Sequence, residues 1–117
     1  MDMNVVADSK LVEAFTLMWG MYPGPASLVH KSKMIIAVNE ACRKGGRIPG
    51  MNCATWTSPD NHRGCRANDA LKEQQPQSKL VIRPDLAFRV YWLPIPGYPD
   101  FYVHFTTETI PLENKPK

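Results

Sequence analysis

The segment from Ser27 to Gly50, SLVHKSKMIIAVNEACRKGGRIPG, constrains the fold more than any other part of the chain. It begins within the first of two short apolar runs, at 26–30 and 34–39, which are separated by the polar residues 31–33 that can form a hairpin turn. Apart from its last residue, the second run is apolar throughout, which suits a strand covered on both faces. The segment therefore predicts an antiparallel strand pair that leads directly into a short helix.

The second half of the chain predicts three more strands. They are expected at 79–82, 86–93 and 101–109, with turns at 83–85 and 96–100. Between the two groups of strands, glycines and prolines interrupt the periodicity, so this block is expected to form short helices and turns, with one longer helix from His62 to Gln74. Together these elements predict an α+β domain with one five-stranded antiparallel sheet, in which the leading pair lies beside the last strand.

The N-terminal region predicts an amphipathic helix. Asp8 and Ser9 can cap it, and the apolar residues that follow recur at helical spacing along one side. This stripe can pack on the core of its own domain, or it can meet the same helix in a second subunit. The residues proposed for such a homodimer contact are Leu11, Phe15, Met18 and Trp19.

This order of elements resembles a PAS domain, a small sensory fold that holds a ligand or a partner between a curved sheet and short helices. The resemblance covers roughly residues 10 to 109 and includes Asn39, Ala41 and Gly50. Asn39 matches the asparagine that often ends the second strand of such domains, where its side chain can cap the next helix.

The resemblance implies a sensory or regulatory module in signal transduction. It implies a leading helix and turn at 1–24, a PAS-like domain at 25–110 and a polar tail or linker at 111–117. It also implies dimer contacts through the leading helix and a downstream signalling domain or protein as a partner. We expect the PAS-like domain to bind a small ligand or a protein.

Length and charge limit the classes of partner. The chain has 117 residues, 44% of them hydrophobic, which suits one domain with a modest core. The net charge of +3 comes from residues scattered along the chain, so no nucleic-acid partner is expected. No apolar run approaches the roughly 20 residues that span a bilayer, and the first residues lack a signal-peptide pattern. We therefore expect a soluble, cytoplasmic protein.

The irregular middle block contains the residues best suited to bind metal. Three thiols and an imidazole could make a tetrahedral zinc site or a thiol redox sensor. Their spacing lacks the tight pair of most structural zinc sites, which favours ordinary thiols over a metal site. The candidate metal ligands are Cys42, Cys53, His62 and Cys65.

Flavin and haem are also considered as cofactors. The residues from Gly50 to Cys53 are similar to the start of the G-x-N-C-R-F-L-Q segment of flavin-binding LOV domains, but the similarity stops at Ala54, where an arginine would bind the phosphate. His62 and His104 could ligate haem, yet the chain has no C-x-x-C-H motif. Neither cofactor is expected.

The last strands carry alternating aromatic and aliphatic residues. Phe88, Val90 and Trp92 share one face of their strand, and Phe101, Val103 and Phe105 share one face of theirs. The inward set can simply fill the core, or it can line a small-molecule cavity. The candidate ligand-binding residues are Asn39, Cys53, Trp56, Phe88, Val90, Trp92, Val103 and Phe105.

Catalysis is not expected from this sequence. It contains no G-x-S-x-G, no phosphate-binding glycine loop and no H-E-x-x-H motif. The alternative is a small enzyme with a cysteine nucleophile served by His62 or His104.

Overall fold

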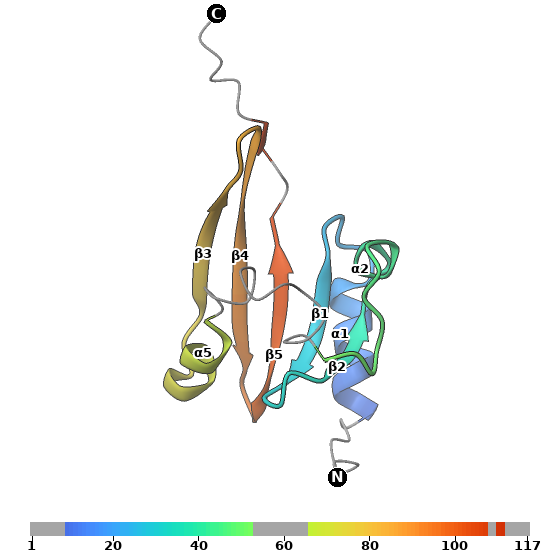
Figure 1. The fold of residues 1–117 in the computed structure, drawn as a ribbon. Coiled ribbons are helices and arrows are strands. Elements are labelled where there is room, and N and C mark those ends of the chain that lie inside the picture. The colour runs from blue at the N-terminus through green and yellow to red at the C-terminus, as the bar shows by residue number, and fades with distance from the viewer. Residues whose placement is uncertain (1–8, 53–65, 108–109, 112–117) are drawn as a thin grey trace, which may run out of the picture.

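The computed structural model describes residues 9–52, 66–107 and 110–111, which form one antiparallel sheet and three helices. The helices are α1 (Ser9–Trp19), α2 (Glu40–Lys44) and α5 (Ala67–Glu73), and the strands are β1 (Ala26–His30), β2 (Ile35–Val38), β3 (Gln77–Ile82), β4 (Leu86–Ile95), β5 (Tyr98–Thr106) and β6 (Ile110–Pro111). Five strands follow the order β2-β1-β5-β4-β3, and the two-residue β6 pairs with β4 (Figure 1). The predicted α+β class and the place of the leading pair beside the last long strand are confirmed.

The leading hairpin forms where the sequence predicts it. β1 and β2 pair with Ser27 opposite Val38, and the turn is closed by the backbone N–H of His30, which donates to the carbonyl of Met34 at 3.0 Å. Lys33 adopts a φ of 78° in this turn. β1 also pairs along its whole length with β5, so the first strand lies in the interior of the sheet.

The β4–β5 hairpin is longer and tighter than predicted. Ile95 pairs with Tyr98, so only Pro96 and Gly97 connect the two strands, and Gly97 has the positive φ of 86° that such a short connection favours. The proline-rich residues 96–100 predict a wider loop. Both strands extend into this region because the glycine allows the chain to reverse within two residues.

The predicted helix at 62–74 is confirmed in its second half as α5. It ends at Gln74, which has a left-handed φ of 52° and whose backbone N–H donates to the carbonyl of Ala70. Residues 62–65 lie outside the described part of the chain. Among the described residues, no helix is long and apolar enough to cross a membrane.

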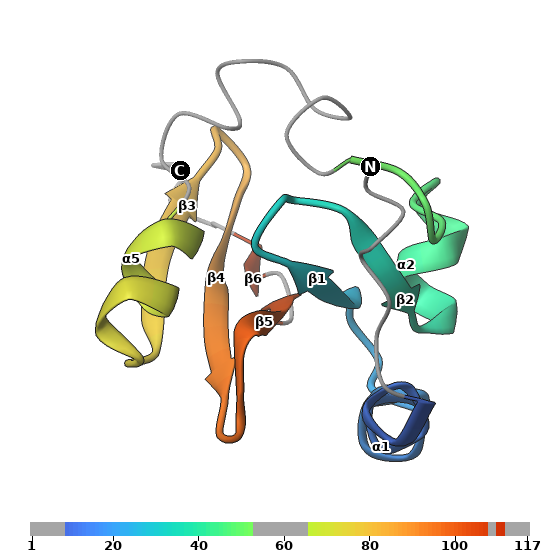
Figure 2. The same ribbon diagram turned by 90° about the horizontal axis from the view of Figure 1, so that it is seen from below.

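The two faces of the sheet support separate apolar clusters. On one side, called the α5 face, Ala67 and Ala70 of α5 pack with strand residues. On the other, called the α1 face, Leu11 and Phe15 of α1 pack with a different set. α1 lies beside β1 and β2, whereas α5 lies beside β3, β4 and β5 (Figure 2). The buried strand residues are Val29, Ile35, Val90, Trp92 and Tyr102 on the α5 face, and Ala26, Leu28, Ala37 and Val103 on the α1 face.

α1 divides its apolar residues between the core and the surface. Leu11 and Phe15 are buried in the α1-face cluster, which confirms packing on the domain's own core for this part of the stripe. Trp19 is partly buried against the same cluster. Met18 is 75% exposed, although the sequence places it on the same stripe. A single helix of three turns can bury only the residues that point directly at the sheet.

Candidate ligand-binding face

The centre of the α5 face holds the cross-strand pair Trp92 and His104. Trp92 lies opposite His104 between β4 and β5, and Ser27 lies opposite His104 between β1 and β5. Opposed residues, and residues two apart on one strand, share a face. Val90 and Phe88 therefore lie on this face with Trp92, and Tyr102 lies on it with His104. The result is a largely apolar surface with one imidazole at its middle.

The imidazole of His104 has an unusual environment. Its ring stacks on the Trp92 indole, with centroids 5.2 Å apart and planes at 28°. The side chain as a whole is only partly buried, but its Nδ1 atom is closed off from solvent and has no hydrogen-bond partner. A buried polar atom without a partner costs about 1 to 3 kcal/mol. The unsatisfied Nδ1 of His104 therefore lowers the stability of the domain at the centre of its sheet.

The charge of His104 follows from the same environment. Burial lowers its pKa from 6.5 to about 4, and the positive charge of Arg47 acts in the same direction. The backbone of Tyr91 acts in the opposite direction and raises the pKa, with a smaller effect. The imidazole is therefore neutral at pH 7, and Arg47 contributes positive charge close to it.

The five predicted ligand residues on β4 and β5 do not share a face. Phe88, Val90 and Trp92 lie on the α5 face, whereas Val103 and Phe105 belong to the α1-face cluster. Grouping these five residues as one ligand-binding set was therefore wrong. Whether a residue of β4 and a residue of β5 share a face depends on the register between the two strands. The two-residue connection sets this register, and the alternation within each strand does not reveal it.

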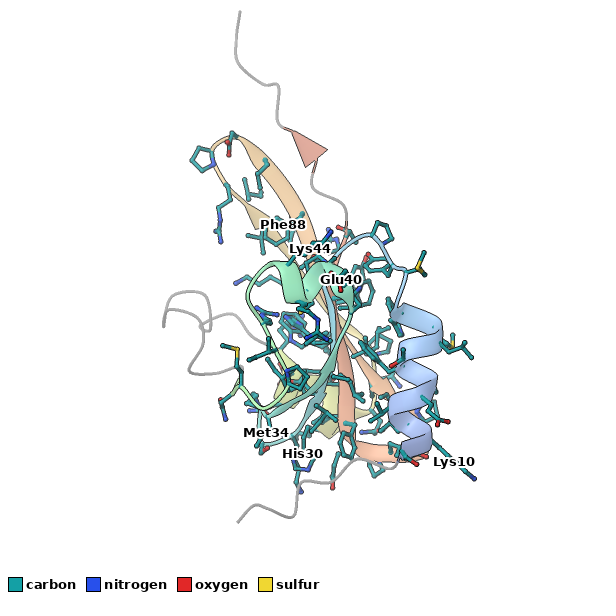
Figure 3. The ribbon with its side chains drawn as sticks, turned by 90° about the vertical axis from the view of Figure 1, so that its right-hand side faces the viewer. Lys10, His30, Met34, Glu40, Lys44 and Phe88 are labelled. Atoms are coloured by element: carbon teal, nitrogen blue, oxygen red, sulfur yellow. The ribbon has the colours of Figure 1, made fainter. Side chains whose placement is uncertain are left out.

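Phe88 lies toward one end of this surface. Figure 3 shows it at the same end of the molecule as Glu40 and Lys44 of α2, with His30 and Met34 toward the other end. Its partner across β3 is Val81, and both side chains are partly buried against the α5-face cluster. Phe88 therefore extends the apolar surface beyond Trp92 along the hairpin.

Asn39 is fully engaged by the backbone. Its side-chain Oδ1 accepts hydrogen bonds from the N–H groups of Ala26 (3.0 Å) and Cys42 (2.9 Å). Its Nδ2 donates to the carbonyls of Trp19 (3.1 Å), Tyr22 (3.2 Å) and Gly24 (2.9 Å). The predicted helix cap is confirmed by the bond from Cys42. With both polar atoms used in this way, Asn39 joins α1, β1 and α2 and has no polar group left over for a ligand.

The predicted metal site can be assessed only in part. Cys42 is buried on α2, while Cys53, His62 and Cys65, together with the predicted ligand residue Trp56, lie outside the described residues. Within 9–52, 66–107 and 110–111, no three His, Cys, Asp or Glu side chains gather in a way that could hold a metal ion.

A groove of about 640 Å³ lies at another place, where the β1–β2 turn, α5 and the start of β5 meet. An ion pair between Lys31 and Asp100, at 3.6 Å, crosses its rim, and Lys33 Nζ donates to Asn68 Oδ1 nearby at 2.8 Å. Both members of the ion pair are more than half exposed, so the pair contributes little to stability. The residues that line the groove are Lys31, Ser32, Asn68, Leu71, Lys72, Pro99 and Asp100.

Comparison with known proteins gives a consistent answer at the level of the fold. No protein-family model and no curated protein matches the sequence. Among solved structures, a sensory box sensor histidine kinase from Vibrio cholerae superimposes with a TM-score of 0.60 over 92% of this chain and 98% of its own, at 14% identity. The chain has a PAS-like fold.

Two further structures share the PAS-like fold. The photoactive yellow protein domain of the sensor histidine kinase Ppr from Rhodospirillum centenum has a TM-score of 0.59 and 20% identity, over 87% of this chain and all of its own. The phage VqmA–DPO complex has a TM-score of 0.61 and 18% identity, and the match covers 86% of this chain but 54% of that one.

No short pattern in the sequence indicates the role of His104 in this PAS-like fold. It lies in the run Val103-His104-Phe105, where a lone histidine on a strand is most often an ordinary packing or surface residue. What distinguishes His104 is that it lies directly opposite Trp92 on the neighbouring strand. To recognise this from the sequence, the register between β4 and β5 would have to be known.

Proposed function

We propose that this chain is a PAS-like sensory or regulatory module in signal transduction, cytoplasmic and without catalytic activity. It binds a small ligand on the α5 face, and a change in occupancy is passed on through dimer contacts of α1. The observation that carries the proposal is the buried Nδ1 of His104, which has no hydrogen-bond partner, on the α5 face. A polar atom left unsatisfied at the centre of a sheet is expected where a ligand completes its hydrogen bond.

The structural neighbours support a sensory role. Two of them are domains of sensor histidine kinases, and the third was solved as a complex with DPO. They share the architecture of this chain at low identity, so the specific argument rests on residues of the α5 face. That surface combines aromatic side chains with few polar groups, which is the usual composition of a small-molecule site.

The ligand proposal predicts that His104→Phe separates binding from stability. The variant should fold with an unchanged or slightly higher melting temperature, because it removes an unsatisfied buried polar atom. Small aromatic fragments that bind the wild type should bind it at least about tenfold more weakly, since a lost hydrogen bond to a ligand is worth roughly that factor. Fragment titration with amide chemical-shift mapping on Val90 and Trp92 measures both the affinity and the place of binding.

The matched control is His30→Phe, which makes the same substitution at an imidazole whose Nδ1 already contacts Ser32 Oγ at 2.9 Å. This variant should bind fragments as the wild type does. Fragments that shift only residues around the Lys31 groove, or equal affinity of His104→Phe and wild type, would contradict the proposed site.

The dimer proposal rests on an exposed apolar patch on α1 and the turn that follows. Leu17, Met18 and Met21 are 86%, 75% and 95% exposed. Of the residues named from the sequence, Leu11 and Phe15 are buried within the chain, so we assign the contact to the outer side of the helix. The double variant Leu17→Asp/Met18→Asp should be monomeric in light scattering, with a melting temperature within a few degrees of wild type.

Two results would count against this dimer. A wild-type protein that is monomeric at high micromolar concentration would remove it directly. An unchanged dimer in the double variant would place the interface elsewhere, and in that case the exposed pair Leu80 and Ile82 on β3 is the next surface to test.

A further inference from the structure

The edge strand β3 provides a binding surface that is separate from the proposed ligand site. We infer that its outer edge binds an extended segment of a partner protein, in which apolar and acidic side chains alternate, as an added strand of the sheet. This inference goes beyond the proposed function, which concerns the α5 face and α1, and it does not depend on either of them.

The first step concerns the direction of the backbone groups of β3. Among the described residues, β3 pairs only with β4, at the end of the strand order (Figure 1). In an antiparallel pair, successive residues direct their N–H and C=O groups alternately toward the partner strand and away from it. The N–H of Arg83 donates to the carbonyl of Leu86 at 2.8 Å, so Arg83 faces β4, as does every second residue before it in the unbroken register. Leu80 and Ile82 therefore direct their backbone groups to the outer edge.

Two other contacts agree with this direction. Arg89, which lies opposite Leu80, uses its backbone on the far side of β4. There its carbonyl accepts from the N–H of Thr107 at 2.9 Å, and its N–H donates to Thr107 Oγ1 at 3.0 Å. At the start of the edge, the outward carbonyl of Ser78 accepts from the guanidinium of Arg66 at 3.5 Å. Beyond Ser78, no group within 9–52, 66–107 and 110–111 pairs with the outward backbone of β3, which leaves donors and acceptors open to an added strand.

The second step concerns the side chains along this edge. Leu80 and Ile82 lie on the side of the sheet that carries α1, and they are 47% and 64% exposed. The helix α1 itself lies beside β1 and β2, at the opposite end of the strand order. Lys79 lies on the α5 face, opposite Val90, and is exposed, as is Arg83 two pairs further along. An added strand therefore meets apolar side chains on one face of the sheet and positive charge on the other.

The acidic residues around the edge leave this positive charge in place. On α5, Asp69 pairs with Arg66 at 3.7 Å, and Glu73 accepts a hydrogen bond from Gln77 at 3.0 Å. Asp85 is exposed and lies beyond the strand, in the turn that leads to β4. A segment that alternates valine with glutamate can thus place its apolar side chains beside those of β3 and its carboxylates on the basic side.

The same charges act against edge-to-edge pairing with a second copy of β3. Such a pair brings Lys79 and Arg83 of both copies to one face of the joined sheet, and like charges on neighbouring strands oppose pairing. A lysine on an edge strand is a common protection against this kind of association. For an acidic segment the repulsion becomes an attraction, so β3 selects its partner by charge.

The experiment compares two peptides that differ only in charge. One is Thr-Val-Glu-Val-Glu-Val-Thr, acetylated and amidated at its ends, and the other carries lysine in place of both glutamates. We expect the acidic peptide to bind about tenfold more tightly, with an advantage that shrinks as salt is added. Hydrogen exchange at the amides of Leu80 and Ile82 should slow when it binds, while the amide of Val81, which faces β4, should exchange as before.

Two variants test the backbone and the charge separately. Leu80→Pro removes an outward N–H and leaves the bonds between β3 and β4 in place, since proline is tolerated on an edge strand at such a position. It should melt within a few degrees of wild type and bind the acidic peptide about tenfold more weakly. Lys79→Glu retains the backbone and should bind the lysine peptide in preference. The control Lys44→Glu makes the same change on α2, which lies beside β1, and should bind both peptides as the wild type does.

Several results would overturn the inference. Amides of Leu80 and Ile82 that are already protected in the free protein would show that another part of the chain covers the edge. Equal affinity for the two peptides, or unchanged preference in Lys79→Glu, would remove the selection by charge even if Leu80→Pro fails to fold. Slowed exchange at Leu80 and Ile82, with a preference that reverses in Lys79→Glu, supports the inference whatever fragment titration shows on the α5 face.

Discussion

Replacing Asn39 by alanine is expected to lower the free energy of unfolding by about 3 to 5 kcal/mol. The side chain is only 3% exposed, and it serves two backbone donors and three backbone acceptors. Leaving even two of these groups unsatisfied costs about 1 to 3 kcal/mol each. Chemical denaturation followed by circular dichroism measures the change.

Two variants test the reason for this loss. Asn39→Asp retains an oxygen for the N–H groups of Ala26 and Cys42, but it places a second oxygen against three carbonyls. Its folded-state pKa should be raised, because only the protonated acid can donate there, so its stability should be highest in acid and should fall as the pH rises through that pKa. Asn52→Ala, which removes a donor to Ser32 at 3.3 Å, should cost about 1 kcal/mol or less.

If Asn39→Ala costs no more than Asn52→Ala, the hydrogen bonds around Asn39 do not stabilise the junction. If Asn39→Asp is equally stable from pH 3 to pH 8, the three carbonyls are not served by the amide.

The sequence could predict Asn39 because its role is local. A strand followed at once by a helix requires a cap, and asparagine is among the best residues for it. The bonds to Trp19, Tyr22 and Gly24 were not predictable in the same way. These bonds depend on how α1 and the turn after it pack against the sheet. Such packing is a tertiary feature that no short sequence pattern encodes.

The faces of the sheet show the same division between local and tertiary information. Alternation along β4 correctly groups Phe88, Val90 and Trp92, since residues two apart always share a face. The relation of this group to β5 changes completely with a shift of one residue. The short connection at Pro96 and Gly97 fixes the register and puts His104, rather than Phe105, opposite Trp92.

The same reason explains why the candidate site was only partly foreseen. An imidazole becomes distinctive through burial, a missing partner and a nearby charge, and all three are properties of the assembled sheet. The aromatic residues of β4 were visible in the sequence because they are apolar in any setting. The middle block with Cys53, His62 and Cys65 lies outside the described residues, so its predicted metal ligands stay a prediction.

The helix α1 offers a second large effect, at Phe15. Phe15→Ala should lower the free energy of unfolding by about 3 to 5 kcal/mol, the usual cost of truncating a buried phenylalanine. Its side chain is 4% exposed and belongs to the α1-face cluster with Leu11 and Val103. Because these contacts lie within one chain, the loss should be the same at low and high protein concentration, as measured by thermal and urea unfolding.

Leu17→Ala is the matched control for Phe15, because it truncates a large apolar residue on the same helix to the same small one. Leu17 is 86% exposed, so in the isolated chain its truncation should change stability by no more than about 0.5 kcal/mol. Any loss that it causes should appear only at protein concentrations where the proposed dimer forms, since a contact with a second copy contributes through mass action. The opposite pattern, in which Phe15→Ala dissociates a dimer without loss of stability at low concentration, would show that the inner side of α1 meets another subunit and not its own sheet.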